Sequence, residues 1–169
     1  MTKLLEEKIV VFTDGAAKGN PGPGGWGVVI AYPDGAVKEL GGPAAHVTNN
    51  QMEMRAVLEG LRALRRTSGP IAVFSDSTYV LKGITAWVFG WQRRGWKTAD
   101  GSDVKNADLW RELHVVASER SKKGEISWGY TPGHKGIPGN ERVDAIASGF
   151  AEKTDVQLYD GRLLDYDVA

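Results

Sequence analysis

The first 40 residues contain short apolar runs that are typical of strands. Later segments show hydrophobic residues at the spacing of an α-helix. Residues 8–13 are apolar on both faces, which predicts a central strand. Further strands are expected at residues 26–32 and 37–40, joined by a turn at residues 33–35. The proline- and glycine-rich segment 19–25 is expected to be a loop that regular structure does not cross. These segments together predict an antiparallel meander.

The rest of the pattern predicts helices that alternate with two more strands. Thr48 and Gln51 fit a capping box at the start of a helix that ends before Ser68. Further helices are expected at residues 77–84, 107–121 and 140–153, and strands at 71–75 and 125–130. Because helical crossovers join parallel neighbours, we expect an α/β fold with a five-stranded mixed sheet, order 3-2-1-4-5, and helices on both faces. Residues 154–169 form a tail whose structure the pattern does not predict.

Composition narrows the class of protein. A length of 169 residues suits one domain. The 21 basic and 21 acidic residues balance, so nucleic-acid binding would require a local patch. The chain has no cysteine, which excludes disulfides and thiolate zinc sites. No segment approaches the roughly 20 apolar residues of a membrane span, and the N-terminal MTKLLEEK lacks a secretory apolar region, so a cytoplasmic protein is expected.

Four acidic residues lie where elements are expected to begin or end: Asp14, Glu53, Asp76 and Asp144. Asp14 and Asp76 each follow an apolar strand, where a lone carboxylate is costly to desolvate. In the expected strand order these two strands lie side by side, and the two helical acids can lean over the same edge. Carboxylate oxygens are the ligands that Mg²⁺ prefers. Two such ions, roughly 3.5–4 Å apart, can stabilise both the attacking and the leaving oxygen of a phosphodiester displacement.

Each acid also has a simpler interpretation. Asp76 can cap the helix from Ser77, and Glu53 can be a surface residue of its helix. Asp144 can be a charge that favours the helix dipole. Taken singly, these interpretations are preferred for all but Asp14. Only the agreement of all four positions in one predicted fold favours a metal site.

Five blocks of the sequence resemble those of one enzyme family. They are TDGAAKGNPGPGG (13–25), TNNQMEMRA (48–56), SDSTYV (75–80), GWKTADGSDVKNADLW (95–110) and GHKGIPGNERVDAIA (133–147). In order and content they are similar to bacterial type 1 ribonuclease H. The resemblance implies a ribonuclease H-like fold, with residues 1–153 as the catalytic domain. It also implies endonucleolytic, two-metal-ion hydrolysis of the RNA strand of RNA–DNA hybrids, giving 5′-phosphate and 3′-hydroxyl ends, as in removal of RNA primers and R-loops.

The resemblance also assigns catalytic roles. The metal ligands would be Asp14, Glu53, Asp76 and Asp144, which would hold two Mg²⁺ ions, with Mn²⁺ as a substitute. His134, in a loop just ahead of Asp144, is expected to assist proton transfer or product departure. His46 is interpreted as a loop residue and His114 as a partly buried structural residue. The expected partner is the RNA–DNA hybrid, with no membrane and no protein partner, and the chain is expected to be a monomer.

Contacts with the hybrid are expected in two regions. The residues concerned are Gly15, Ala16, Asn20, Thr48, Asn49, Asn50, Thr78, Trp87, Arg93, Arg94 and Lys97. Those up to Asn50 would lie in the minor groove, where the ribose 2′-hydroxyl is read, or hold a DNA-strand phosphate through Asn20 and Thr48. Thr48 can equally be a pure helix cap. Thr78 stands where the family often has glutamine, so its contact with a base stays open.

Residues 87–97 combine three tryptophans with three cations. The family has a basic protrusion at this segment. The resemblance therefore implies that Arg93, Arg94 and Lys97 contact phosphates and that Trp87 lines a DNA groove. The alternative is aromatic packing of a helix, which suits Trp91 and Trp96. Two rival functions are a nuclease of the same fold that acts on DNA and a non-catalytic module that binds hybrids. The complete set of acids argues against the second.

Overall fold

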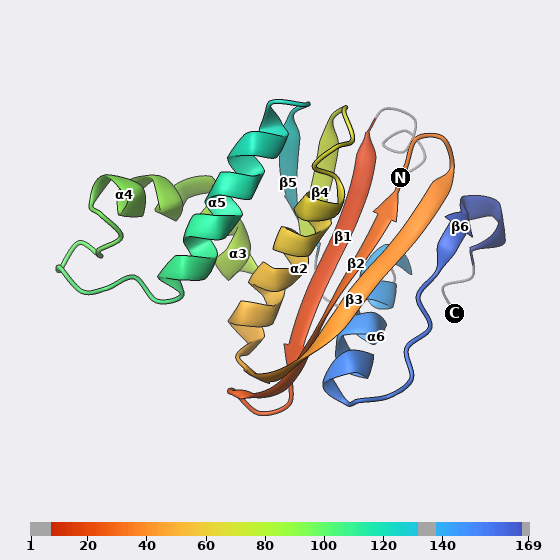
Figure 1. Ribbon diagram of the computed structural model, residues 1–169, viewed down its shortest axis with the longest axis horizontal. Coiled ribbons are helices and arrows are strands. Elements are labelled where there is room, and N and C mark those ends of the chain that lie inside the picture. Colours follow the sequence, from red (N-terminus) through yellow and green to blue (C-terminus); the bar gives the residue numbers. More distant parts are fainter. Residues whose placement is uncertain (1–7, 132–137, 167–169) are drawn as a thin grey trace.

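A mixed sheet lies at the centre of the computed structural model, which describes residues 8–131 and 138–166. Within these residues the sheet has six strands in the order β5-β4-β1-β2-β3-β6 (Figure 1). They are β1 (Ile9–Ala17), β2 (Gly22–Ala31), β3 (Ala36–Val47), β4 (Ile71–Ser75), β5 (Ile126–Tyr130) and β6 (Asp160–Arg162). β1 pairs antiparallel with β2 and parallel with β4, so it lies inside the sheet, as predicted.

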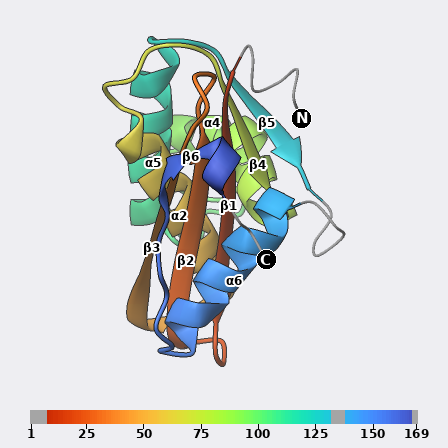
Figure 2. The same ribbon diagram turned by 90° about the vertical axis from the view of Figure 1, so that its right-hand side faces the viewer.

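Helices cover both faces of the sheet. They are α2 (Asn49–Ala63), α3 (Thr78–Lys82), α4 (Val88–Arg93), α5 (Ala107–Ser121) and α6 (Pro138–Ala151), with a π-helical turn η1 (Gly83–Trp87) and a 3₁₀ turn η2 (Leu163–Asp165). Figure 2 shows α2 and α5 on one side of the sheet and α6 on the other. In the described parts of the chain, no helix combines the length and apolar character that a membrane span requires.

The core has two layers because β1 buries side chains on both of its faces. Ile9 and Val11 belong to the cluster beneath α2 and α5, whereas Val10 and Phe12 belong to the cluster beneath α6. This division follows from the period-2 alternation of a strand. The continuous apolar run therefore predicted the central position of β1 correctly.

The predicted strand order is confirmed, but the number of strands is wrong. The C-terminal tail supplies β6, which pairs antiparallel with β3 and matches Val37 with Gly161. An edge strand offers unpaired N–H and C=O groups that another segment can complete. The short sequence Asp160-Gly161-Arg162 has no apolar alternation, so hydrophobic pattern alone does not reveal it as a strand.

The predicted loop over residues 19–25 is also wrong in its second half. β2 begins at Gly22, and only residues 18–21 connect it to β1. A Cβ at Gly25 would lie 2.3 Å from the carbonyl oxygen of Ala147 on α6. This glycine is therefore a strand residue on which a helix packs directly. β3 likewise continues to Val47 and includes His46, which is an exposed strand residue rather than a loop residue.

The helix boundaries follow local sequence signals more closely. Thr48 Oγ1 accepts a hydrogen bond from the Gln51 N–H at 3.2 Å, and Gln51 Oε1 accepts one from the Thr48 N–H at 3.0 Å. The capping box at the start of α2 is therefore confirmed. α5 has the predicted bounds. The helix expected at residues 77–84 starts correctly but continues through η1 into α4.

Candidate active site

Three carboxylates from different elements meet beside the centre of the sheet. Asp14 lies on β1, Glu53 in the second turn of α2 and Asp76 directly after β4, and one oxygen of each lies within 4.8 Å of the others. The parallel pairing of β1 and β4 brings the two aspartates together. The expectation that Asp14 follows the end of its strand is wrong, because β1 continues to Ala17. It is therefore a buried strand residue, only 4% exposed.

The fourth predicted acid comes from α6, on the other side of the sheet from α2 (Figure 2). Asp144 lies on α6 and is not one of the three carboxylates within that distance. Its charge nevertheless reaches Asp14 and contributes to raising the pKa of that carboxyl group. Elements from both faces of the sheet thus direct acids towards one place.

The pKa values show the cost of gathering these acids. Burial first, and then the charges of Asp76 and Asp144, raise the pKa of Asp14 to about 7, although hydrogen bonds from Glu53 and the Gly15 N–H oppose this rise. The pKa of Glu53 also lies well above its ordinary value, because of burial first and then the charges of Asp14 and Asp76. Proton sharing between neighbouring acids is the expected response to such crowding. A bound cation would relieve it.

The donor set fits a divalent cation. Glu53 Oε2 is buried and has no hydrogen-bond partner within the described residues. A buried oxygen of this kind is costly to desolvate unless something else satisfies it. The cluster offers only carboxylate oxygens, which suit Mg²⁺, Ca²⁺ or Mn²⁺ rather than softer metals. These residues can therefore hold a hard divalent ion.

The simpler interpretations of two acids are excluded. The residue that caps α3 is Ser77, whose Oγ accepts a hydrogen bond from the Val80 N–H at 3.2 Å, so Asp76 is not the cap. Glu53 is not an ordinary surface residue, because its Oε2 is buried. Both side chains are thus left for a role at the acidic cluster.

Gly15 allows α2 to approach β1 at the site. A Cβ at this position would lie 2.3 Å from the backbone nitrogen of Glu53 and 2.3 Å from the carbonyl carbon of Met52. Such contacts are too short for any side chain. The Gly15 N–H also donates to Asp14 Oδ1 at 2.8 Å, which orients that carboxylate. The absence of a side chain at Gly15 therefore sets the distance between two of the acids.

The predicted phosphate-holding residues also lie together. The Asn49 N–H donates to Asn20 Oδ1 at 3.1 Å, and Asn49 Oδ1 accepts from the Ala17 N–H at 2.8 Å. Thr48 caps the same end of α2. Asn50 and Thr78 are exposed, at the starts of α2 and α3. The β1–β2 turn and the start of α2 thus form one polar surface next to the acids.

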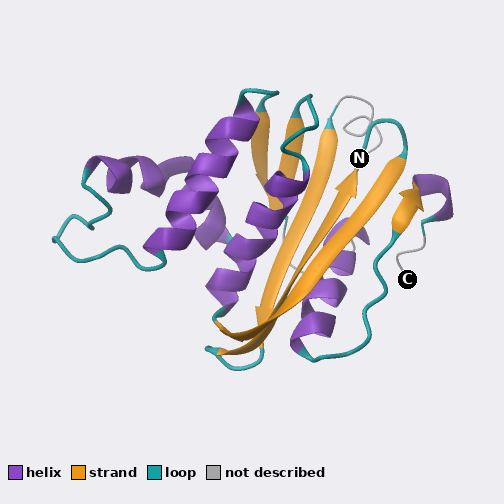
Figure 3. Ribbon diagram, viewed as in Figure 1, coloured by secondary structure: helices purple, strands orange, loops and turns teal. Residues whose placement is uncertain are grey.

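The aromatic and basic segment has both features that the sequence suggested. α4 and the loop after it project from the body of the molecule (Figure 3). Arg93, Arg94 and Lys97 are exposed there, and Lys97 forms an ion pair with Asp103. Trp87 is 40% exposed, with its ring centroid 5.8 Å from that of Trp91. Aromatic packing therefore supports a surface that carries the cations outward.

The other aromatic and histidine predictions have mixed outcomes. Trp91 and Trp96 are partly buried and pack against the core, as the alternative interpretation proposed. His114 is partly buried, with its ring 5.7 Å from that of Phe89, so its structural interpretation is confirmed. His134 lies outside the described residues.

Sequence reasoning missed two polar networks. Asn106, with a left-handed φ of 61°, accepts from Gln51 Nε2 and donates to the Tyr79 hydroxyl, which joins α2, α3 and the start of α5. Asparagine directly before a helical pattern is a recognisable signal for such a position. The second network surrounds Glu39, which is buried and bound by Arg142. Its signal is the strand alternation, which places Glu39 on the same face as Val37.

Known proteins resemble this chain along most of its length. The RNase H family model matches residues 6–152. Ribonuclease H from Cyanothece sp. is 48% identical over 153 residues, covering 90% of this chain and 94% of the relative. Ribonuclease H from Cupriavidus metallidurans is 51% identical over 142 residues, covering 84% and 94%.

Solved structures agree with these matches. LC9-RNase H1, a type 1 RNase H with the type 2 active-site motif, aligns with a TM-score of 0.76 at 30% identity, covering 92% of this chain and 78% of that one. LC11-RNase H1 in complex with RNA/DNA hybrid has the same fold, with a TM-score of 0.62 at 23% identity, covering 86% and 98%. The chain therefore belongs to the ribonuclease H family, and it is a metal-dependent enzyme that cleaves RNA in RNA–DNA hybrids.

Proposed function

We propose that the enzyme hydrolyses the RNA strand of a hybrid with two Mg²⁺ ions held by Asp14, Glu53, Asp76 and Asp144. The observation that carries this proposal is the meeting of three carboxylates within 4.8 Å, with the charge of Asp144 on α6 also reaching Asp14. The products would be 5′-phosphate and 3′-hydroxyl ends, and the cellular task removal of RNA primers and R-loops. Mn²⁺ can substitute, because it takes similar oxygen ligands.

The chain's own residues prepare the site for this chemistry. The Gly15 N–H holds one oxygen of Asp14, and Glu53 Oε2, which has no hydrogen-bond partner among the described residues, offers a further ligand atom. When bound, a pair of Mg²⁺ ions supplies stabilisation of the negative charge on the attacking and departing oxygens. His134 would move a proton or help the product to leave.

Substrate selection would use the surfaces on either side of the acids. Asn20 and Thr48 would hold a DNA-strand phosphate, and Gly15, Ala16, Asn49 and Asn50 would reach the minor groove, where the 2′-hydroxyl distinguishes RNA. Trp87, Arg93, Arg94 and Lys97 would hold the hybrid further along. We place the catalytic domain in residues 1–153 and expect a cytoplasmic monomer that needs no protein partner.

A cleavage assay tests the proposal. Labelled RNA–DNA hybrid, duplex DNA and duplex RNA are incubated with the protein and Mg²⁺, and the products are resolved on a gel. We expect internal cuts in the RNA strand of the hybrid alone, abolished by EDTA and by Asp14→Asn. Cleavage of duplex DNA would favour the DNA-acting nuclease, and binding of the hybrid without Mg²⁺-dependent cleavage would favour the non-catalytic module.

His134→Ala tests the auxiliary role. General acid–base groups typically contribute about 10²–10⁴-fold to the rate. We therefore expect His134→Ala to lower kcat by about 10²-fold. Mg²⁺ affinity, measured by calorimetry, should stay near that of the parent. Equal losses of kcat and Mg²⁺ affinity would instead make His134 a ligand.

A further inference from the structure

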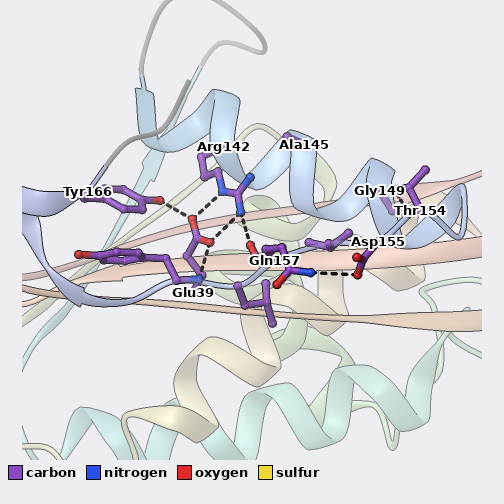
Figure 4. Close-up of a pocket in the computed structure, with 11 residues that line it drawn as sticks. Glu39, Arg142, Ala145, Gly149, Thr154, Asp155, Gln157 and Tyr166 are labelled. Carbon is purple, nitrogen blue, oxygen red and sulfur yellow. Dashed lines mark hydrogen bonds and ion pairs between the residues drawn. The ribbon is translucent and has the colours of Figure 1, made fainter.

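Glu39 is buried and lies at the centre of a polar network on the face of the sheet that α6 covers (Figure 4). Arg142 on α6 donates from Nε and Nη2 to the two carboxylate oxygens of Glu39, at 2.6 and 2.8 Å. The C-terminal tail adds two more donors, the Tyr159 N–H at 2.9 Å and the Tyr166 hydroxyl at 2.5 Å. One carboxylate thus joins β3, α6 and the tail.

The network holds a charge where burial alone opposes one. Burial would raise the pKa of Glu39, but hydrogen bonds from Arg142, Tyr166 and the Tyr159 N–H outweigh it and hold this pKa below its ordinary value. A bidentate arginine–carboxylate pair fixes the relative orientation of the two side chains as well as their distance. A buried ion pair is weak evidence for net stability, so a role in fixing geometry is the hypothesis that suits this pair.

Arg142 and Asp144 flank the buried strip of α6 on opposite sides. Successive residues of an α-helix are about 100° apart, so two positions separate their side chains by about 200°. Val143 and Ile146, both fully buried, lie between them against the sheet. A rotation of α6 about its axis that moved Asp144 away from Asp14 would therefore also displace Arg142 from Glu39.

Apolar packing of Val143 and Ile146 holds α6 against the sheet, but such packing is less directional than a bidentate ion pair. Cβ atoms at Gly27 and Gly41 would lie 2.9 and 2.6 Å from side-chain atoms of Ile146. Glycines let the helix come close, but they supply no side-chain ridges for its grooves. Asp14 and Asp144 also repel each other when both are charged. The bidentate ion pair from Arg142 to Glu39 is thus a directional contact that opposes rotation of the helix.

We infer that Glu39, acting through Arg142, is a positioning residue that keeps Asp144 at the metal centre, and that the C-terminal strap, residues 154–166, completes this device. Because Asp144 is taken as a metal ligand, the role of Glu39 rests on the proposed function. In this proposal the strap holds Glu39 in position, in addition to burying apolar side chains. Its Tyr159 N–H and Tyr166 hydroxyl keep the acceptor of Arg142 in place.

Mg²⁺ binding to the full-length protein, measured by calorimetry without nucleic acid, tests the inference. Changing partners that orient metal ligands typically costs about 10–100-fold in metal affinity, so we expect Glu39→Gln and Arg142→Lys to weaken Mg²⁺ binding about tenfold. The KM for the hybrid should stay unchanged, and kcat should recover at high Mg²⁺. Glu152→Gln is the matched control, because it breaks the ion pair with Lys18 just beyond the other end of α6 and should leave Mg²⁺ affinity unaltered.

A milder variant guards against loss of folding. Tyr166→Phe removes one hydroxyl donor from Glu39 and keeps the ion pair, so the protein should fold and bind Mg²⁺ less tightly than the parent but more tightly than Arg142→Lys. Unchanged affinity in both Tyr166→Phe and Arg142→Lys would overturn the inference. Ile30→Val, in the opposite core layer, controls for a general loss of stability.

Asp144→Asn separates this inference from the proposed function. If Asp144→Asn weakens Mg²⁺ binding and Glu39→Gln does not, the positioning role fails and the ligand assignment stands. If Asp144→Asn leaves binding intact, the ligand assignment itself fails. In the double variant, Glu39→Gln should add almost nothing to the loss caused by Asp144→Asn, because both act on one ligand. Additive losses would mean that Glu39 supports the protein only in a general way.

Discussion

Asp14 shows at the scale of one residue how a site can oppose the stability of its own fold. It is 4% exposed, surrounded by other acids, and its pKa is raised to about 7. A pKa above the value of 3.8 in the unfolded chain contributes stability below about pH 4 and loses it as the pH rises through about 7. At neutral pH the metal-free protein therefore retains an unfavourable charge at a position that we propose as a metal ligand.

Asp14→Asn should separate stability from activity. The amide does not ionise, so in EDTA at pH 8 we expect the variant to melt several degrees above the parent, which corresponds to a gain on the order of a few kcal/mol. Cleavage of the hybrid should be lost. Mg²⁺ should raise the Tm of the parent and hardly change that of the variant, as thermal melts will show. Identical Tm values in EDTA at pH 8 would contradict this account.

Close contact between elements, rather than a local motif, sets the distances at the site. α2 reaches β1 only because Gly15 has no side chain, and α6 reaches β2 only because Gly25 and Gly27 have none. Capping signals place the start of α2, but they say nothing about how near the helix comes to the sheet. The glycines of the segment predicted as a loop are thus partly packing positions.

Gly15→Ala should disrupt the acidic cluster. The new methyl group would lie 2.3 Å from the Glu53 nitrogen, so α2 must move away from β1. We expect a loss of about 1–3 kcal/mol in the free energy of unfolding, as for other overpacked positions, and much weaker Mg²⁺ binding. Calorimetry and denaturant melts measure both. Gly90→Ala is the control, because its Cβ would meet only the end of Arg94 at 3.2 Å, and a parent-like Mg²⁺ affinity is expected there.

The projecting α4 should act as a handle for the hybrid. Arg93→Ala combined with Arg94→Ala should raise KM with little change in kcat, because these cations lie at the end of α4, which carries none of the clustered acids. Each lost phosphate contact should reduce the salt slope of binding by about 0.9. Arg65→Ala with Arg66→Ala removes the same charge from exposed positions after α2 and should leave KM unchanged. An unchanged KM in the Arg93→Ala, Arg94→Ala variant would show that these two arginines do not bind the hybrid.

At the scale of the whole molecule, two separate groups of acids have opposite pH behaviour. In the acidic cluster, burial raises the pKa of Asp14 and Glu53. In the network around Glu39, hydrogen bonds from Arg142, Tyr166 and the Tyr159 N–H outweigh burial and lower the pKa of Glu39. The raised pKa values cost stability as the pH rises, whereas the lowered one costs stability as the pH falls below 4.5.

The metal-free protein should therefore be most stable in mildly acidic solution. In EDTA we expect a higher Tm near pH 5 than at pH 8, and a fall again towards pH 3 as Glu39 takes up a proton. Saturating Mg²⁺ should remove the loss at pH 8, because the ions bind the deprotonated acids. Thermal melts across this pH range provide the measurement. A Tm in EDTA that rises steadily from pH 5 to pH 8 would show that the acidic cluster does not dominate.

The sequence by itself determined the features that depend on near neighbours in the chain. The apolar run of β1 predicted its central place, the Thr48 capping box predicted the start of α2, and positions just after apolar runs identified Asp14 and Asp76. It could not reveal β6, because pairing with β3 depends on a free sheet edge rather than on hydrophobic alternation. Only the tertiary structure decided how close the acids lie to one another. It alone also brought Arg142 and Tyr166 within hydrogen-bonding distance of Glu39. Those contacts link positions more than 100 residues apart, and no periodicity along the chain encodes such distances.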